Sequence, residues 1–414
     1  MRLHLPGDKS ISHRALMLGA LAEGTSHLSN VSSGADVLST RQCLEQCGIP
    51  IREEGQQIVI EGQGGVFKSP EEELNAGNAG TTARLLTGLL AGRGIHARII
   101  GDSSLMRRPM DRVVEPLLQM GANIQLSLRG TLPLAIHPAQ LGKLGYTLPV
   151  ASAQVKSALL LAGLASEGPV RVTEPAPSRN HTELMLQALG VDLQVSDNRI
   201  TLGSGKQRIA PFELNVPGDP SSAAFPAALA AMLPKTELTF DNLLLNPTRM
   251  GFFRAIKRMG AQISWKSKLQ NLGEEVGELT IRSSELRGIK ISGTEIPSLI
   301  DEIPVLAILA TQAKGATVVR DAGELRVKES DRIKAVCENL KRMGVRIQEL
   351  TDGFRIWGPT TLRAATIRTY HDHRIAMAFA VASRIAVGKT TLDDPDCVEI
   401  SFPGFHDTIR RVAS

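Results

Sequence analysis

The chain has 414 residues, a formal charge of +5 at pH 7 and a sequence pI near 9.1. That length is long for one hydrophobic core, so we expect two domains. The basic charge predicts an anionic partner, either a nucleic acid or small phosphorylated and carboxylated molecules. Aromatic residues make up only 3% of the chain, which leaves few rings for stacking bases, and no Lys/Arg tract suits a nucleic-acid backbone. Small anionic molecules are therefore favoured, and nucleic acid is not expected.

The cysteines and the apolar runs bear on the compartment. Cys43, Cys47, Cys337 and Cys397 form no CxxC pair and no disulfide framework, which suits a reducing compartment. Residues 1–6 lack an apolar signal core, and the longest apolar run, 223–233, is too short to span a bilayer. We therefore expect a cytoplasmic protein, or a mature organellar one, without a membrane partner. Cys43 and Cys47 share a helix face, but no further ligand lies near them, so no metal site is predicted.

In chain order, one pattern occurs six times: a polar cluster, in most copies after a glycine turn or a strand, leads into a run of small apolar residues. The first copy is Gly7 to Arg14 followed by 15–22, and the others begin at Gly77, Val150, Pro217, Asp301 and His371. The pattern predicts a helix whose first turn can hold an anion through unpaired N–H groups and whose later turns are buried.

A second marker runs in phase with the first. An amphipathic segment ends at Gly48, Gly121, Gly190, Gly260 and Gly344, at intervals of 73, 69, 70 and 84 residues, and each glycine predicts a helix end followed by a strand. The repeat is strand, buried helix, strand, amphipathic helix, strand, strand. Six such repeats predict an α/β protein that divides most simply into two domains of three repeats.

Several polar clusters lie at the starts of these helices. Lys9, Ser10 and Arg14 form either a capped helix start with solvated charges or a cationic set that binds an anion. Pro109 forces Arg108 out of helical geometry, so we expect Arg107 and Arg108 to point in different directions. The charge run 326–332 is typical of a solvated helix face, yet it follows a strand as the other clusters do. His371 and His373 could bind a metal, but the adjacent Arg374 favours an anion.

At these positions the sequence resembles the 5-enolpyruvylshikimate-3-phosphate synthase family. The resemblance rests on Gly7–Arg14, Asn75–Thr81, Arg108–Met110, Ser152–Gln154, Ser178–Glu183, Leu325–Arg332 and Tyr370–Ala376, and it extends from residue 6 to about residue 405. It implies an inside-out α/β barrel in each of two domains, with three βαβαββ repeats, buried helices and outward sheets. The expected domains are 8–218 and 1–7 with 219–414, so the first strand belongs with the C-terminal half.

The implied reaction moves the enolpyruvyl group of phosphoenolpyruvate to the 5-hydroxyl of shikimate 3-phosphate by addition and elimination. Addition needs a base at the hydroxyl and an acid at the methylene carbon, and in elimination the roles of acid and base are reversed. The resemblance gives Asp301 as the base and Glu329 and Lys9 as candidates for proton transfer at the methylene. It implies no metal and no organic cofactor. We expect a monomer.

The resemblance also implies two sets of substrate-binding residues. For shikimate 3-phosphate they are Lys9, Ser10, Arg14, Ser152, Ala153, Gln154, Ser178, Arg179, Asp301 and Lys328. For phosphoenolpyruvate they are Lys9, Asn78, Gly80, Arg108, Gln154, Arg332, His373 and Arg374.

The sequence departs from the family pattern at two places, and three alternative functions are considered. Ile400 stands where some members have a lysine, and Thr81–Leu85 differs from the herbicide-sensitive class. A UDP-N-acetylglucosamine enolpyruvyl transferase would need a loop cysteine, and none lies between 100 and 115. A nucleic-acid-end processing enzyme is disfavoured by the scarcity of aromatics. A non-catalytic anion-binding protein would not need Asp301 and Glu329 together.

Overall fold

The computed structural model describes residues 1–205 and 207–414, and they form two compact units. The N-terminal unit consists of Gly7–Val216 with Gln270–Glu274, and the C-terminal unit of Met1–Pro6, Pro217–Leu269 and Glu275–Ser414. Both units mix helices and small sheets, so the predicted α/β class is confirmed.

The N-terminal unit alternates strands with helices in the predicted order. Its helices are α1 (Lys9–Leu21), α2 (Ala35–Gln46), α3 (Gly80–Leu90), α4 (Asp111–Gln119), α5 (Ala153–Gly163) and α6 (His181–Ala188). Its strands are β2 (Glu23–Ser29), β3 (Ile51–Glu54), β4 (Gln57–Gln63), β5 (Leu74–Asn75), β6 (Ala97–Ile100), β7 (Asn123–Leu126), β8 (Leu134–His137), β9 (Leu144–Thr147), β10 (Val170–Thr173), β11 (Leu193–Ser196), β12 (Arg199–Leu202) and β13 (Glu213–Asn215).

The C-terminal unit follows the same plan. Its helices are α7 (Pro220–Met232), α8 (Gly251–Arg258), α9 (Ile303–Gln312), α10 (Arg332–Arg342), α11 (His373–Ser383) and α12 (Phe405–Ala413). Its strands are β1 (Arg2–Leu3), β14 (Glu237–Leu244), β15 (Gln262–Asn271), β16 (Glu274–Arg282), β17 (Lys290–Ile291), β18 (Gly315–Val319), β19 (Arg346–Leu350), β20 (Gly353–Gly358), β21 (Thr366–Ile367) and β22 (Thr391–Leu392).

Each four-stranded sheet has one strand order. An edge strand pairs in parallel with the strand that follows the buried helix, and an antiparallel hairpin completes the sheet, as in β5-β6-β8-β7 and β17-β18-β20-β19. The sixth repeat differs from the predicted βαβαββ pattern, because only the parallel pair β21-β22 is formed among its described residues.

Two sheets are completed by a strand from a distant part of the chain. β1 precedes α1 in the chain but pairs in parallel with β14, and β13 precedes α7 but pairs in parallel with β2. The first strand thus pairs with a strand of the C-terminal unit. In each unit, one sheet therefore includes a strand that lies far along the chain from the strand with which it pairs.

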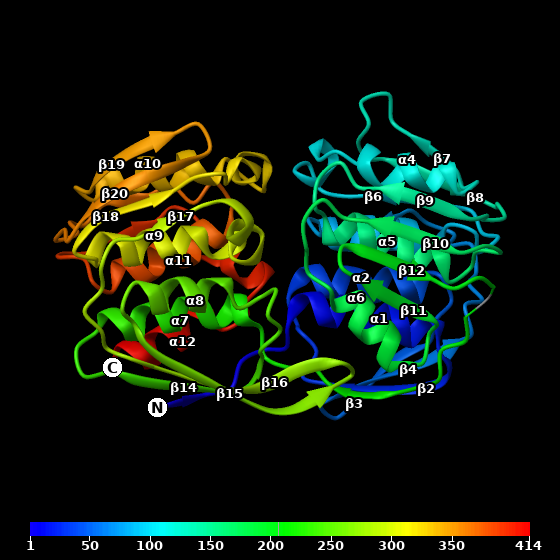
Figure 1. Ribbon diagram of the computed structural model, residues 1–414, viewed down its shortest axis with the longest axis horizontal. Coiled ribbons are helices and arrows are strands. Elements are labelled where there is room, and N and C mark those ends of the chain that lie inside the picture. The colour runs from blue at the N-terminus through cyan, green and yellow to red at the C-terminus, as the bar shows by residue number, and fades with distance from the viewer. Residues whose placement is uncertain (206) are drawn as a thin grey trace. The chain divides into compact units, whose positions relative to one another are not determined.

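The first helix of each repeat is buried. In α7 every residue from Pro220 to Ala231 is buried, so an all-apolar helix gains contact on all sides. In the C-terminal unit, α7, α9 and α11 lie inside, with β18 and β20 on one side and β14 and β16 on another (Figure 1). In the N-terminal unit, α3 lies so close to α5 that a Cβ on Gly88 would lie 2.1 Å from the carbonyl oxygen of Ala158. Only glycine permits that approach.

The glycines predicted to end the amphipathic helices are all in the left-handed region. The φ angles of Gly48, Gly121, Gly190, Gly260 and Gly344 lie between 78° and 99°. A residue with a Cβ pays a steric cost there, so these positions select glycine and end each helix before its strand.

The tip of the β15–β16 hairpin belongs to the N-terminal unit although its strands continue into the other unit. The Asn271 amide donates to the backbone oxygen of Asn215 at 2.7 Å. Gly273, at φ +80°, leaves no room for a Cβ against the carbonyl of Leu184 in α6. Glu274 contacts His181 at 2.7 Å with both side chains buried. The tip is thus a packed part of the N-terminal unit.

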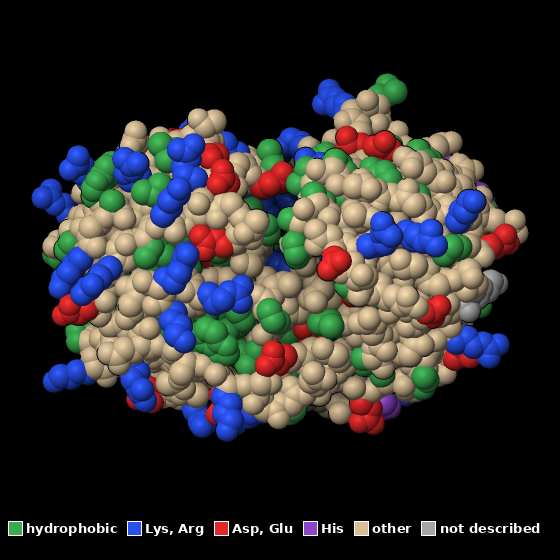
Figure 2. Space-filling model, in the orientation of Figure 1, with side chains coloured by type: hydrophobic (Ala, Val, Ile, Leu, Met, Phe, Trp, Pro, Cys, Tyr) green, Lys and Arg blue, Asp and Glu red, His purple; other side chains and the backbone are tan. Residues whose placement is uncertain are grey.

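No helix among the described residues is long and apolar enough to cross a membrane. On the face shown in Figure 2, Lys and Arg side chains stand in separate groups, and Asp and Glu side chains lie beside several of them.

Candidate active site

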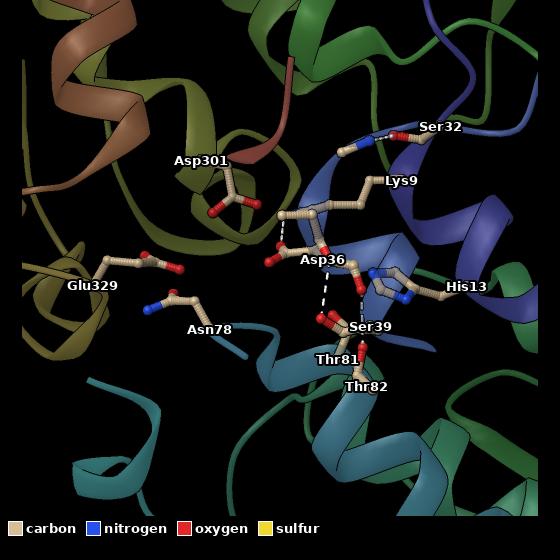
Figure 3. Close-up of polar contacts among 12 residues, drawn as sticks. Lys9, His13, Ser32, Asp36, Ser39, Asn78, Thr81, Thr82, Asp301 and Glu329 are labelled. Carbon is tan, nitrogen blue, oxygen red and sulfur yellow. Dashed lines mark hydrogen bonds and ion pairs between the residues drawn. The ribbon is translucent and has the colours of Figure 1, made fainter. Parts of the chain in front are cut away.

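The start of α1 presents the first predicted cation. The Asp8 carboxylate accepts from the backbone N–H of Ile11 and so caps the helix. Lys9 follows in the first turn, and its ammonium lies 2.8 Å from a carboxylate oxygen of Asp36 in the first turn of α2 (Figure 3). Both side chains are mostly buried, so the pair fixes the lysine with less solvent screening than a surface pair has.

A buried chain of polar side chains joins the N-terminal halves of α1, α2 and α3. His13 contacts the Thr40 hydroxyl at 2.7 Å, and Thr40 contacts the Thr82 hydroxyl at 2.7 Å (Figure 3). Burial, the largest effect, lowers the pKa of His13 to about 3, so its ring is neutral at pH 7 and acts here as a fixed hydrogen-bonding group.

Arg108 is held beside the loop that leads into α3. It has extended backbone geometry before Pro109, as predicted. Its guanidinium donates to the Asn78 side-chain oxygen at 2.8 Å, and the Asn78 amide in turn donates to Asp102 at 2.6 Å. Arg107 is exposed while Arg108 is half-buried, so the expected difference in direction is confirmed.

Gly80 lies between two guanidinium groups. A Cβ placed on Gly80 would be 2.7 Å from Arg84 and 3.5 Å from Arg108. Arg84 also donates to the Gln154 side-chain oxygen at 2.8 Å, and Gln154 donates to Thr81 at 3.0 Å. Gly80, Arg108 and Gln154, predicted from separate motifs, are thus brought together, and Arg84 joins them.

Arg14 is turned into the unit. Its guanidinium donates to Thr182 and Ser157, both at 2.7 Å, and to the backbone oxygen of Ser10 at 3.0 Å. Burial, the largest effect, lowers the pKa of Arg14 to about 10, and Glu183 partly offsets this. The side chain remains charged at pH 7 and links α1, α5 and α6.

The remaining predicted residues of this unit border the same helices. Ser152 caps α5, since its hydroxyl accepts from the backbone N–H of Val155 at 3.4 Å, and Ala153 begins the helix. Ser178 and Arg179 lie half-buried in the loop before α6, where the Ser178 hydroxyl donates to Glu174. The contacts of Arg14 join α1 to α5 and α6, and those of Gln154 join α5 to α3. The N-terminal parts of these helices, where helix dipoles favour anions, are thus brought together.

The C-terminal unit gathers its predicted residues around one buried cation. Arg332, at 2% exposure, donates to Asp372 at 2.8 Å and to Glu329 at 2.6 Å, and it reaches Asp301 at 3.5 Å. Asp301 lies in the 3-10 turn Ile300–Glu302 before α9, and Glu329 lies in the loop before α10. The carboxylates of Asp301 and Glu329 point toward the same region of this unit (Figure 3).

The charge balance of this cluster follows from burial and pairing. Burial, the largest single effect, lowers the pKa of Arg332, but Asp372, Glu329 and Asp301 together outweigh it and the net pKa is raised. Arg332 lowers the pKa of Asp372 despite burial of that carboxyl. Arg332 and Asp372 therefore stay ionised more readily than isolated buried groups would.

Asp372 also caps the N-terminus of α11. It accepts from the backbone N–H of Arg374 at 2.9 Å and from the Ser330 hydroxyl at 2.9 Å. His373 and Arg374 occupy the first turn and are buried. Lys328 lies 3.7 Å from Asp301. Ile400 ends the 3-10 turn Asp396–Ile400 and packs on the core, so no cation stands at that position.

The four cysteines are free and buried. Burial raises the pKa of each thiol to about 12, so none provides a reactive thiolate. Cys43 and Cys47 belong to α2 or its cap, Cys337 to α10 and Cys397 to a 3-10 turn. This argues against the alternative transferase that uses a loop cysteine. Among residues 1–205 and 207–414, no group of three or more His, Cys, Asp or Glu side chains could hold a metal ion.

Sequence reasoning missed three residues of these clusters: Asp36, Arg84 and Asp372. Each lies within a helix start that follows a strand, which is the signal that identified the others. Arg84 stands seven residues after Gly77 as Arg14 stands seven after Gly7, so comparison of the repeats could have found it.

Comparison with known proteins agrees with this geometry. The family model described as EPSP synthase (3-phosphoshikimate 1-carboxyvinyltransferase) matches residues 1–409. The 3-phosphoshikimate 1-carboxyvinyltransferase of Synechococcus sp. is 49% identical over 416 residues, covering 99% of this chain and 94% of the relative. That of Bacillus thuringiensis subsp. konkukian is 45% identical over 411 residues, covering 99% and 96%.

A solved structure gives the same result for the fold. The EPSP synthase from Acinetobacter baumannii superposes with a TM-score of 0.90 at 40% identity, covering 100% of this chain and 95% of that one. The chain therefore has the two-domain inside-out α/β barrel fold, and it belongs to the EPSP synthase (3-phosphoshikimate 1-carboxyvinyltransferase) family.

Proposed function

We propose that the protein transfers the enolpyruvyl group of phosphoenolpyruvate to the 5-hydroxyl of shikimate 3-phosphate. The C–O bond to the 5-oxygen forms as the hydroxyl loses its proton and the methylene carbon gains one. The resulting tetrahedral adduct then loses a methyl proton and phosphate leaves, which regenerates the enol ether. This is the chorismate branch of aromatic amino acid biosynthesis.

The observation that carries the proposal is the grouping of Asp301 and Glu329 on one buried guanidinium, Arg332. Two carboxylates held beside one fixed cation can each transfer a proton to or from a different atom of the same substrate. A protein that only binds anions gains nothing from two carboxylates there, because they repel its ligand.

We assign the roles as follows. Asp301 accepts the proton of the 5-hydroxyl. Glu329 and Lys9 serve the methylene carbon, giving a proton on addition and removing one on elimination. The bond to the 5-oxygen forms and phosphate leaves with the help of proton transfers and of fixed cations, so we propose that neither a metal nor an organic cofactor takes part.

The substrate-binding roles are part of the same proposal. Phosphoenolpyruvate is bound by Lys9, Asn78, Gly80, Arg108, Gln154, Arg332, His373 and Arg374. The position of Gly80 beside the guanidinium groups of Arg84 and Arg108 supports this, because two cations at a helix start favour an anion. Shikimate 3-phosphate is bound by Lys9, Ser10, Arg14, Ser152, Ala153, Gln154, Ser178, Arg179, Asp301 and Lys328. The contacts of Arg14 to α5 and α6 support a role in shaping that site.

One assay tests the reaction. Purified protein is incubated with both substrates and with each alone, and released phosphate is measured. Phosphate is expected only when both are present. Its absence with both substrates present would refute the proposed function.

Glyphosate is the herbicide that inhibits the family which this sequence resembles, and it displaces phosphoenolpyruvate. We expect Gly80→Ala to weaken binding of glyphosate more than that of phosphoenolpyruvate. The new methyl would press on Arg84 at 2.7 Å and narrow the space beside Arg108. Glyphosate is the longer molecule, so a clash of about 1–3 kcal/mol should fall mainly on it. The inhibition constant should rise at least about tenfold while the KM for phosphoenolpyruvate rises less.

The measurement is the ratio of the two constants in both proteins. Gly94→Ala is a suitable control in the same unit, because a Cβ there meets nothing within 4 Å, although its φ of +72° adds some backbone strain. An equal or lower ratio in Gly80→Ala would show that Gly80 does not border the phosphoenolpyruvate site.

We further propose that the protein acts as a cytoplasmic monomer and that the two compact units are its domains. Light scattering coupled to size exclusion tests the first point, since a mass near 44.5 kDa is expected.

A further inference from the structure

A buried charged cluster lies beneath the loop that carries Ser178. Glu174 follows β10 and is 4% exposed, and one of its carboxylate oxygens lies 2.6 Å from the ammonium of Lys156. The other oxygen accepts the proton of the Ser178 hydroxyl. Lys156, on α5, is 1% exposed and also contacts Glu183 of α6 at 2.7 Å. One lysine therefore joins α5, α6 and the loop between β10 and α6.

The two carboxylates of this cluster have different surroundings. Glu174 uses both oxygens, one for Lys156 and one for Ser178. Glu183 uses one oxygen for Lys156, and the other has no hydrogen-bond partner among the described residues. Burial of ions is costly unless they are paired. Glu183 thus balances the charge of Lys156, whereas Glu174 carries a connection onward to the loop.

That connection reaches residues proposed to bind shikimate 3-phosphate. Ser178 precedes Arg179 in the loop, and Lys156 follows Gln154 by two residues in α5. A serine hydroxyl has one proton, so its donation to Glu174 fixes the direction of the Ser178 side chain. The ammonium of Lys156 is shared between Glu174 and Glu183, so it offsets part of the negative field of Glu174 that a phosphorylated substrate would meet.

We infer that Glu174, held by Lys156, is a positioning residue that orients the Ser178 hydroxyl and its loop for shikimate 3-phosphate. This inference rests on the proposed function. Glu174 touches no reacting atom and acts through Ser178, so its loss affects affinity for one substrate and leaves the chemical step intact.

The test is a double-mutant cycle with Glu174→Ala and Ser178→Ala. Each single variant is expected to raise the KM for shikimate 3-phosphate about five- to tenfold, with kcat and the KM for phosphoenolpyruvate within about twofold of the unmutated protein. The double variant should show no more than the larger single effect, because both substitutions remove one shared connection. Calorimetric titration with shikimate 3-phosphate should give the same ratios.

Glu183→Gln is the matched control, since it alters the other carboxylate on Lys156 and leaves Ser178 untouched. It should lower Tm without changing the KM for shikimate 3-phosphate by more than about twofold. If Glu174→Ala does not fold, Glu174→Asp keeps the charge but is one methylene too short to contact both partners, and the same rise in KM is expected.

An unchanged KM for shikimate 3-phosphate in the Glu174 variant that folds would overturn the inference. So would a double variant in which the rise in KM equals the product of the two single rises. These outcomes are distinct from failure of the proposed function, in which the unmutated protein releases no phosphate from the two substrates.

Discussion

Replacing Asp301 with alanine should lower kcat by about 10²–10⁴ while changing the affinity for shikimate 3-phosphate by less than about tenfold. A lost general base removes a step of the chemistry, whereas the substrate keeps its other contacts. Removal of Asp301 also leaves Arg332 with Glu329 and Asp372, so the cluster remains paired and the fold should persist. Steady-state kinetics and calorimetry on the same preparation measure both quantities.

Asp407→Ala is the control for Asp301→Ala. Asp407 is an exposed carboxylate of the same unit that pairs with Arg410 within α12, and its loss should leave kcat unchanged. If Asp301→Ala kept more than about a tenth of the turnover, Asp301 would not be an essential base.

The second large effect concerns Arg332, whose replacement by methionine should cost about 3–5 kcal/mol of unfolding free energy. The substitution would leave the carboxylates of Asp301, Glu329 and Asp372 facing one another without their shared cation. Turnover should fall as well, because the two proposed proton-transfer groups lose their common anchor. Urea denaturation followed by circular dichroism gives this free energy from the midpoint and the slope of the transition.

Two further variants define what Arg332 contributes. Arg332→Lys should recover only part of the stability, because one ammonium cannot copy a guanidinium that contacts three carboxylates. Arg326→Met is the control in the same charge run, since Arg326 is partly exposed to solvent and its pairs should contribute at most about 1 kcal/mol. Equal losses from Arg332→Met and Arg326→Met would show that burial of the Arg332 cluster does not matter.

The repeat plan of the fold could be predicted because it follows from local rules. A buried helix must be apolar on all sides, which makes Ala223–Ala231 recognisable from sequence. A helix that ends in a left-handed residue selects glycine, which makes the helix end at Gly121 recognisable. The sixth repeat could not be predicted from these rules, because the loss of a hairpin depends on packing that a local pattern does not record.

The candidate residues were predictable by motif, but their pairing was not. Arg326 and Arg332 belong to one charge run, yet Arg326 pairs at the surface with Asp331 and Glu349 whereas Arg332 is buried. What separates them is Asp372, forty residues further on. The spacing of residues in the sequence does not predict such long-range partners, and it does not predict the buried hydrogen bonds of Arg14 with Ser157 and Thr182.

The hairpin tip formed by Gln270–Glu274 sets a condition on chimaeric enzymes built from this family. Four peptide bonds separate the two units, after residues 6, 216, 269 and 274. A recombinant that joined residues 1–216 of this chain to the remainder of a relative would receive the relative's tip. The foreign residue at the position of Glu274 would then have to match the local His181. Successful crossovers should therefore carry the codons for the tip together with those for α6, as one inherited block.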